Sequence, residues 1–174
     1  MGRKPARVYT RARGPAYTRR KFMGGVPQSR ITIFEHDLKK DYPYRVLLIS
    51  GSDCQITHIA LESARIGANK VLSEECGSQN YFMKIRPYPH QVLTIHKQAV
   101  GAGADRISQG MRHAFGVPVG TAARVKKGQI LIEVFVNEEK IDSAKEALRK
   151  AKMKFPAKCR IKIEKIEPKN REGS

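Results

Sequence analysis

The sequence has no tryptophan, few other aromatic residues and only three cysteines among 174 residues. So few aromatic rings suit a modest aliphatic core rather than a large aromatic-lined ligand cavity. The cysteines, Cys54, Cys76 and Cys159, have no CxxC spacing. The odd count and the missing CxxC pairs argue against a disulfide framework and leave a zinc site without ligand pairs. We expect three small, reduced, partly buried residues and no metal.

Long apolar runs are also missing. No segment approaches the roughly 20 apolar residues that a membrane-spanning helix needs. The N-terminal Met-Gly-Arg-Lys-Pro has no apolar stretch behind it, unlike a secretory signal. No helix with large apolar residues opposite its cations is evident, so a membrane surface is not an expected partner. We expect a cytosolic protein.

Acidic residues are scarce and unevenly distributed. Thirty-four Lys and Arg face sixteen Asp and Glu, which gives a net charge of +18. A surface of this charge repels itself unless a polyanion neutralises it, so nucleic acid is the leading class of partner. Residues 1–30 hold nine of the cations and no acid, and residues 101–128 and 145–174 are also basic. A nearly balanced body should therefore carry three basic zones.

Residues 1–30 are expected to be an RNA-binding arm. Glycine and proline are scattered among its cations without helical or strand periodicity, and alone it cannot bury enough apolar surface to offset the entropy of ordering. Bound to RNA, it could follow phosphates while its tyrosines stack on bases or ribose. A merely solubilising tail is the alternative. The candidate contacts are Arg3, Lys4, Arg7, Tyr9, Arg11, Arg13, Tyr17, Arg19, Arg20 and Lys21.

Residues 31–167 have the periodicity of a single α+β domain. Apolar runs and alternating patterns predict seven strands. They lie at about residues 31–34, 45–49, 81–86, 91–97, 121–125, 129–136 and 160–166. The strands on either side of Lys127-Gly128 are expected to form a hairpin in a largely antiparallel sheet. Residues 168–174 would be a short polar tail.

Two helices are expected on one face of that sheet. The first should cover about residues 54–75, with Ser52 or Asp53 as its N-cap. Gly77 is a plausible C-terminal stop. The buried stripe of this helix consists of small residues, which allows close packing on a sheet. The second should begin after an Asn137 cap and end in a cluster of cations. Candidate RNA contacts on the body are Arg124, Lys126, Lys127, Lys152 and Lys154.

The glycine-rich residues 101–120 form a long aperiodic stretch, which inside a compact domain is either functional or disordered. Its composition permits close backbone approach to a partner, and its cations could meet phosphates. A dinucleotide-binding loop at Gly101-Ala-Gly103 fails, because no third glycine stands at position 106 and no helix with an acidic ribose ligand follows. Residues expected to shape this central loop are Gly101, Gly103, Asp105, Gly110 and Met111, and its candidate RNA contacts are Arg106, Arg112 and His113.

Catalytic machinery is not visible. The five histidines stand in dissimilar contexts, without a nucleophile motif or paired carboxylates at useful spacing. We expect them at the surface or facing RNA, and we expect no cofactor. An RNA-modifying or RNA-processing enzyme would need a pocket or an acid/base cluster. A free-standing chaperone or chromatin-like binder would leave the central loop unexplained.

Several segments together resemble one family. They are Gly2-Arg-Lys-Pro-Ala-Arg-Val-Tyr9, Gly24-Gly-Val-Pro27, Leu61-Glu-Ser-Ala-Arg-Ile-Gly-Ala-Asn-Lys70, Gly101-Ala-Gly-Ala-Asp-Arg106, Gly110-Met-Arg-His-Ala-Phe-Gly116, and Ala123-Arg-Val125 with Gly128-Gln129. From about residue 2 to 165, the chain resembles the archaeal and eukaryotic L-ten-e branch of the universal large-subunit ribosomal proteins, whose bacterial member is L-sixteen. His113 and Val117 depart from the common pattern and favour the archaeal branch.

The resemblance implies a structural, non-enzymatic protein of cytoplasmic ribosomes with a two-layer α/β-hammerhead-type domain. It implies binding to large-subunit rRNA near the 5S rRNA and the central protuberance, beside neighbouring ribosomal proteins. Family members help to form the seat of the A-site tRNA. Residues 101–114 would be the loop that points toward the peptidyl-transferase centre and the P-site tRNA, with Arg106 and Arg112 as contacts. The arm from Arg3 to Lys21 would thread into rRNA.

Overall fold

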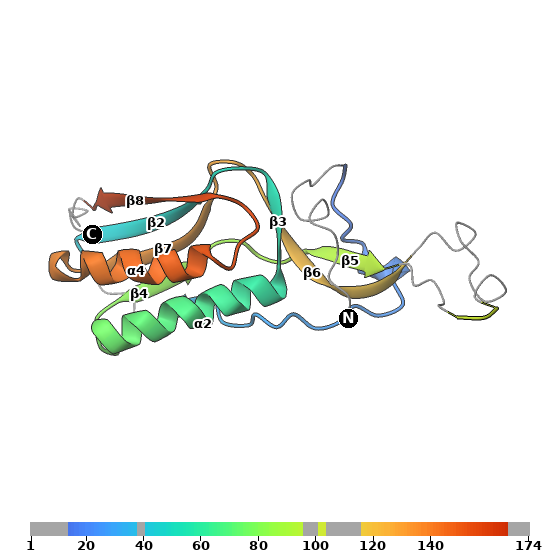
Figure 1. Cartoon of the computed structure of the whole chain (residues 1–174), viewed down its shortest axis with the longest axis horizontal. Coiled ribbons are helices and arrows are strands. Elements are labelled where there is room, and N and C mark those ends of the chain that lie inside the picture. The colour runs from blue at the N-terminus through green and yellow to red at the C-terminus, as the bar shows by residue number, and fades with distance from the viewer. Residues whose placement is uncertain (1–13, 38–40, 96–100, 104–115, 167–174) are drawn as a thin grey trace, which may run out of the picture.

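The computed structural model describes residues 14–37, 41–95, 101–103 and 116–166 (Figure 1). The strands are β1 (Glu35–His36), β2 (Tyr44–Ser50), β3 (Cys54–Thr57), β4 (Phe82–Ile85), β5 (Gln91–Ile95), β6 (Val117–Val125), β7 (Ile130–Val136) and β8 (Cys159–Lys165). The helices are α2 (His58–Glu75) and α4 (Ile141–Lys152), with 3-10 turns η1 (Arg20–Phe22) and η3 (Glu138–Lys140). These elements confirm the predicted α+β class with two helices.

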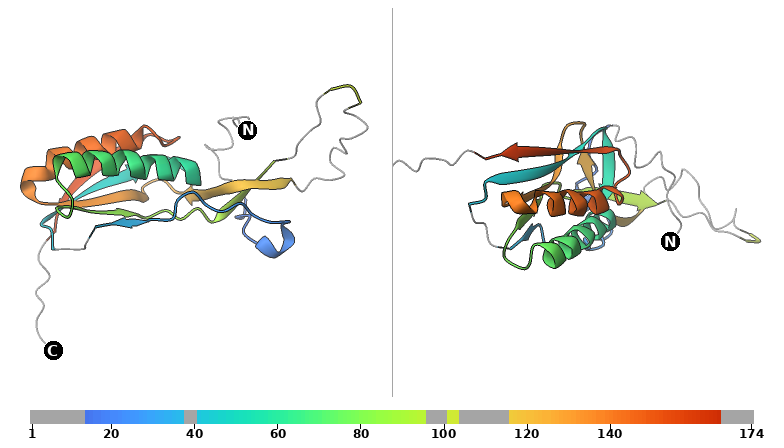
Figure 2. Two further views of the ribbon diagram at one scale, coloured as in Figure 1. Left: turned by 90° about the horizontal axis from the view of Figure 1, so that it is seen from below. Right: turned by 60° about the vertical axis from the view of Figure 1, so that its left-hand side comes forward.

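The strands form two sheets rather than one. A five-stranded sheet has the order β1-β4-β7-β2-β8, and a three-stranded sheet has the order β3-β6-β5. Every strand pairing in the described residues is antiparallel. Both helices lie together on one face of the five-stranded sheet, and the three-stranded sheet extends beyond them (Figure 2). The opposite face of the five-stranded sheet, which we call the open face, has no helix over it.

The core lies between the two helices and the five-stranded sheet. Alternate residues of the central strands, such as Val46 and Leu48 of β2, are fully buried beneath the helices. Burial of each such side chain contributes on the order of 1.5–3 kcal/mol. Half of the ten buried helix positions are alanines, among them Ala64 and Ala68 of α2 and Ala144 and Ala147 of α4. Small side chains let the helices approach closely, as the sequence predicted for α2.

The predicted hairpin at Lys127-Gly128 is wrong, although both of its strands exist. β6 belongs to the three-stranded sheet and β7 to the five-stranded sheet, and the two do not pair. Instead β2 and β3 form one bent ribbon that pairs along its length with β7 and then β6, as in the pairs Leu48↔Ile132 and Cys54↔Val125. Pairing between segments some 80 residues apart therefore replaces the local pairing that the turn residues suggested.

The start of the first helix also differs from the prediction. Residues 54–57 are strand β3, and α2 begins at His58 with Thr57 as its cap, whose Oγ1 accepts a hydrogen bond from Ala60 N at 3.3 Å. The expected caps Ser52 and Asp53 lie before β3 instead. Cys54, Gln55 and Ile56 are all buried, so the apolar content of this segment is equally suited to a buried strand and to a helix. The predicted stop is confirmed, since Gly77 follows the helix with φ +78°.

Two further predictions fail locally. Residues 31–34 form no strand, although Ile31 is buried in the core, and β1 covers only the two residues that follow Phe34. The Asn137 side chain makes no capping bond, because the short turn η3 precedes α4. The strands predicted at 45–49, 81–86 and 160–166 are confirmed as β2, β4 and β8. The strand predicted at 91–97 is confirmed up to Ile95, where the described residues stop.

Candidate nucleic-acid interface

Three connections of the chain meet at one end of the five-stranded sheet, and we call them together the basic end. They are the β2–β3 connection (residues 51–53), the β6–β7 turn (residues 126–129) and the α4–β8 connection (residues 153–158). Gly51 N donates to Lys158 O at 2.8 Å, and Gly128 N donates to Ser50 O at 2.8 Å. These backbone bonds hold together segments that are far apart in the sequence.

Two glycines permit this arrangement. A Cβ on Gly51 would lie 2.6 Å from Lys158 O, so any side chain there would force the two connections apart. Gly128 has φ +83°, a conformation that residues with a side chain rarely adopt. Asp53 Oδ1 accepts a hydrogen bond from Lys127 N at 2.7 Å. The acid that was expected to cap a helix therefore ties the turn to the β2–β3 connection.

The basic end exposes cations whose charge is not compensated nearby. Lys126, Lys127, Lys154 and Lys158 are all exposed. Within the described part of the chain none of them forms an ion pair. Asp53 is the one acid of these three connections. Exposed, unpaired ammonium groups on short loops are suited to phosphate contacts.

The structure separates the five body residues that the sequence suggested as RNA contacts. Lys126, Lys127 and Lys154 lie at the basic end, and Lys152 is exposed in the last turn of α4. A cation at a helix C-terminus also compensates the helix dipole, so Lys152 has a structural role in any case. Arg124 is half-buried on β6 and interacts within the domain, which makes it the weakest of the five candidates.

Sequence reasoning did not select Lys158, which the structure places at the centre of the basic end. It is exposed, and its carbonyl accepts the hydrogen bond from Gly51. Arg160, at the start of β8, is also exposed and was not selected either. The charge count of residues 145–174 contained the signal. The position beside the β6–β7 turn could not be read from it, because it depends on β2 pairing with both β7 and β8.

The described part of the arm is attached to the domain at two points, one on strand β5 and one at the start of α2. Tyr17 O accepts a hydrogen bond from Val92 N at 2.9 Å, and Arg30 N donates to His58 Nδ1 at 2.8 Å. Between these points lies the turn η1, with Arg19, Arg20 and Lys21 exposed. The predicted contacts Arg3, Lys4, Arg7, Tyr9, Arg11 and Arg13 lie outside the described residues. The absence of helical or strand periodicity in the arm is consistent with this single short turn.

His58 is not the surface or RNA-facing residue that the sequence suggested. It is only 8% exposed, in the first turn of α2. Burial lowers its pKa from the ordinary value of 6.5, and the nearby Arg30 lowers it further. A neutral ring is also what the geometry requires, because Nδ1 accepts the hydrogen bond from Arg30 N. His58 is thus a structural anchor for the arm.

His36 is likewise partly buried and engaged. Its Nε2 lies 2.7 Å from Arg65 Nη1, and Arg65 donates two further hydrogen bonds to Glu62, from Nε at 2.9 Å and from Nη2 at 2.6 Å. Burial and then the Arg65 charge lower the pKa of His36, while the hydrogen bond from Arg65 lowers the pKa of Glu62. The cluster fastens β1 to α2 and has no nucleophile in it.

The central loop connects two paired strand ends. Ile95 of β5 is the register partner of Val117 of β6, so residues 96–116 form the connection of a long hairpin. Gly101 and Gly103 have φ +126° and +79°, and this short described stretch lies far beyond the three-stranded sheet (Figure 1). The other predicted loop residues, Asp105, Arg106, Gly110, Met111, Arg112 and His113, lie outside the described residues.

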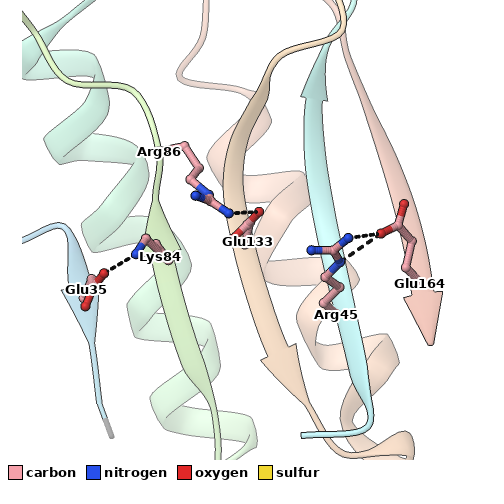
Figure 3. Close-up of polar contacts among 6 residues, drawn as sticks. All are labelled: Glu35, Arg45, Lys84, Arg86, Glu133 and Glu164. Atoms are coloured by element: carbon pink, nitrogen blue, oxygen red, sulfur yellow. Dashed lines mark hydrogen bonds and ion pairs between the residues drawn. The ribbon is translucent and has the colours of Figure 1, made fainter. Parts of the chain in front are cut away.

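Most cations of the open face of the five-stranded sheet are paired with carboxylates (Figure 3). Arg45 pairs with Glu164 at 2.6 Å, Arg86 pairs with Glu133 at 3.0 Å, and Lys84 pairs with Glu35. The cross-strand register brings these partners together. Cations that already have carboxylate partners are poor phosphate ligands, so this face is not part of the candidate interface.

Other kinds of site find no support in the described residues. No group of three or more His, Cys, Asp or Glu is placed to hold a metal ion, and no described helix is long and apolar enough to cross a membrane. The three cysteines are free and buried, as expected. Burial raises the pKa of the Cys159 thiol to about 11, so this sulfur is not a nucleophile near neutral pH.

An α+β domain with paired charges on its sheet and unpaired cations on its loops is a polyanion-binding protein, and the arm and glycine-rich loop direct that class toward RNA. A model of the family "Ribosomal protein L16p/L10e" matches residues 12–162. The chain belongs to this family of ribosomal proteins.

The relatives agree over nearly the whole length. The chain is 54% identical over 166 residues to the large ribosomal subunit protein uL16 of Picrophilus torridus, covering 95% of this chain and 94% of the relative. It is 52% identical over 169 residues to uL16 of Staphylothermus marinus, covering 97% of each. Both relatives are archaeal, in line with the branch that the sequence favoured.

Family membership makes the chain a structural protein of the large subunit of the cytoplasmic ribosome rather than an enzyme. Its partners are rRNA and other ribosomal proteins, and its role belongs to translation.

Proposed function

We propose that this chain binds large-subunit rRNA near the 5S rRNA and the central protuberance, and that it helps to form the seat of the A-site tRNA. The observation that carries the proposal is the segregation of charge. Unpaired cations gather at the basic end and along the arm, whereas the open face of the sheet is compensated. The basic end and the arm therefore attract phosphates, and the open face does not.

Binding would rest mainly on phosphate neutralisation, with shape providing the specificity. The lysines of the basic end would contact phosphates of folded rRNA and fix the orientation of the domain. Irregular RNA is recognised through its shape and exposed bases, which suits a rigid set of connected loops. The arm would extend this contact away from the body. In this division residues 1–30 are the arm, 31–167 the domain and 168–174 a tail.

The central loop would reach toward the peptidyl-transferase centre and the P-site tRNA. Its root, between Ile95 and Val117, is held by the pairing of β5 with β6. The glycines let its backbone approach RNA closely, and Arg106 and Arg112 are the cations that it carries toward phosphates. The chemistry of peptide transfer would remain with the RNA.

Sedimentation tests the proposal as a whole. Native lysate would be fractionated on sucrose gradients at moderate and high salt, and the protein followed against the subunit peaks. Comigration with the large subunit that survives high salt is the expected result. A protein that runs free at moderate salt would instead be a free-standing RNA binder, and the proposed position on the subunit would be wrong.

A variant of the central loop tests the proposed role in the seat of the A-site tRNA. Arg106→Ala combined with Arg112→Ala should leave the unfolding free energy unchanged and the protein on the large subunit, while A-site tRNA binding to the purified subunits decreases. A matched variant, Lys70→Ala with Lys145→Ala, removes the same charge from cations that are paired on the helices and should leave tRNA binding unchanged. Equal tRNA binding by both variants would remove the loop from the proposed tRNA seat.

A further inference from the structure

Phe22 is a large apolar side chain in an unusual position. It is 70% exposed at the end of η1, within the basic arm. The other exposed aromatic residue of the described chain, Tyr88, packs against Phe34 with ring centroids 5.6 Å apart and the rings tilted. Phe22 has no aromatic or core partner of this kind among the described residues. Most of its surface is therefore open to a ligand.

The ring is carried by a turn with its own hydrogen bonds. Phe22 N donates to Arg19 O at 3.3 Å, Met23 N donates to Arg20 O at 3.0 Å, and Gly25 N donates to Met23 O at 2.7 Å. The chain on either side is attached to the domain through Tyr17 O and Arg30 N, as described above. Binding through a ring that is already held in place costs less conformational entropy of the chain than binding through a free segment.

The turn that carries the ring also carries three cations. Lys21 Nζ lies 4.8 Å from the centroid of Phe22, and Arg19 and Arg20 are exposed on the same turn. No acidic residue occurs among residues 1–30. A ligand for this turn must therefore combine a flat apolar surface with neighbouring negative charge. An unpaired nucleotide has both, since its base can stack and its flanking phosphates can meet the cations.

The side of the molecule that carries the turn is also accessible. In the left-hand view of Figure 2 the dark blue η1 turn lies on the side of the sheets opposite the helices. The two points that hold the turn lie in or next to the three-stranded sheet. Val92 is on β5, and His58 directly follows β3. The turn thus projects from the small sheet without covering the helix layer.

We propose that Phe22 stacks on an unpaired base of the bound RNA while Arg19, Arg20 and Lys21 contact the phosphates beside that base. The inference rests on the proposed binding to rRNA and adds to it a residue that reads an exposed base. One face of the ring lies beneath Lys21 Nζ, and the opposite face would stack on the base. Stacking of this kind tolerates different bases, because each has a flat aromatic face.

The test measures binding of the full chain to purified large-subunit rRNA at several salt concentrations. Phe22→Leu keeps an apolar side chain but removes the aromatic face, and it should weaken binding about 5- to 100-fold. The slope of log affinity against log salt should stay the same, because no cation is lost. Phe22→Tyr should bind like the unchanged protein. Tyr88→Leu, a matched change of an exposed aromatic residue, should also leave the affinity unchanged.

Photocrosslinking gives an independent readout. Ultraviolet irradiation of the complex should yield a peptide containing Phe22 joined to a single nucleotide, and the Phe22→Leu complex should lose this product. Equal affinity of the Phe22→Leu and unchanged proteins would overturn the stacking proposal. Normal rRNA affinity of Phe22→Leu combined with poor incorporation into subunits would also overturn it, because the ring would then bind in a pocket of a neighbouring protein. Failure of the unchanged protein to bind rRNA would instead overturn the proposed function.

Discussion

On the open face of the five-stranded sheet, Arg45, Lys84 and Arg86 each meet a carboxylate from a neighbouring strand. At the basic end, Lys126, Lys127 and Lys158 meet none among the described residues. The two regions share strands β2, β7 and β8, so the difference is not one of fold. It lies in which side chains the register places side by side, and it shows that a net charge of +18 need not be spread evenly.

Compensation on the sheet has a structural reason. Glu133 is only 1% exposed at the centre of the open face, where an unpaired carboxylate would be costly. Arg86 donates to it from above, and its own side chain remains half-exposed. The loop lysines need no such partner, because their charges remain hydrated until RNA binds. One region thus uses charge to maintain the fold and the other keeps charge available for binding.

Removing residues 2–13 should give the largest change in binding. Five cations are lost, and if all five contact phosphates the log–log salt slope becomes shallower by about 3.5 to 4.5. The bond between Tyr17 O and Val92 N is retained, so the unfolding free energy should change little. Filter binding to purified rRNA over a salt series measures the slope. An unchanged slope would mean that the arm does not bind phosphate.

The triple variant Lys126→Gln, Lys127→Gln and Lys158→Gln tests the basic end itself. Losing three phosphate contacts should make the same slope shallower by about 2 to 2.7, without loss of stability. A control that removes equal charge from paired cations combines two residues of the open face with one of α4: Arg45→Gln, Lys84→Gln and Lys145→Gln. If the control reduces the slope as much as the triple variant, the two regions do not differ in binding.

Glu133→Ala should have the opposite effect to the lysine variants, lowering stability without lowering affinity for rRNA. It removes a buried carboxylate that holds Arg86, and the unfolding free energy should fall by about 2–3 kcal/mol from the lost hydrogen bond and the cavity. Urea unfolding measures this loss, and Glu133→Gln, which keeps the volume, should lose less. Affinity for rRNA should stay unchanged in both variants. A drop in affinity without a drop in stability would place the open face in the interface.

Acid should weaken the attachment of the arm through His58. The unfolded chain takes up a proton near the ordinary histidine pKa of 6.5, whereas the lowered pKa of His58 makes the folded chain resist it. The unfolding free energy should therefore be fully maintained above pH 6.5 and decrease as the pH falls from there toward the folded pKa. Urea titrations at pH 7.5, 6.5 and 5.5 would follow this decrease.

The variant His58→Gln isolates that contribution. Its side-chain oxygen can still accept the hydrogen bond from Arg30 N but does not titrate, so the pH dependence should become weaker. The pH dependence that remains in this range is attributed to His36, whose pKa is also lowered. His90→Gln, at an exposed position, should behave like the unchanged protein. An undiminished pH dependence in His58→Gln would show that protonation of His58 does not affect stability.

Lys84→Gln should have the smallest effect. Its pair with Glu35 is largely exposed, and ion pairs at such positions contribute about 0–1 kcal/mol. Added salt should reduce even this difference in urea unfolding. A loss above about 2 kcal/mol would mean that the pairs of the open face act as one network rather than as separate contacts.

How far sequence reasoning reached depends on the range of the interactions involved. Strands β2, β4 and β8 and the end of α2 at Gly77 follow from local patterns, because apolar periodicity and glycine conformation act within a few residues. The hairpin at Lys127-Gly128 was wrong because the turn is local but the strand pairing is not. The same is true of residues 54–57, which pair with β6 and so form a strand rather than the first turn of a helix.

The site divides in the same way. The number of cations and their distribution along the chain predicted a polyanion as the partner, because so basic a chain with an acid-free arm repels itself unless negative charge neutralises it. The order of short sequence motifs along the chain identified its family. Only the tertiary structure decided which cations are available, since pairing depends on cross-strand register and on backbone bonds such as that from Gly51 to Lys158. It also decided that His58 is an anchor and that Phe22 stands exposed, because burial depends on neighbours distant in the sequence.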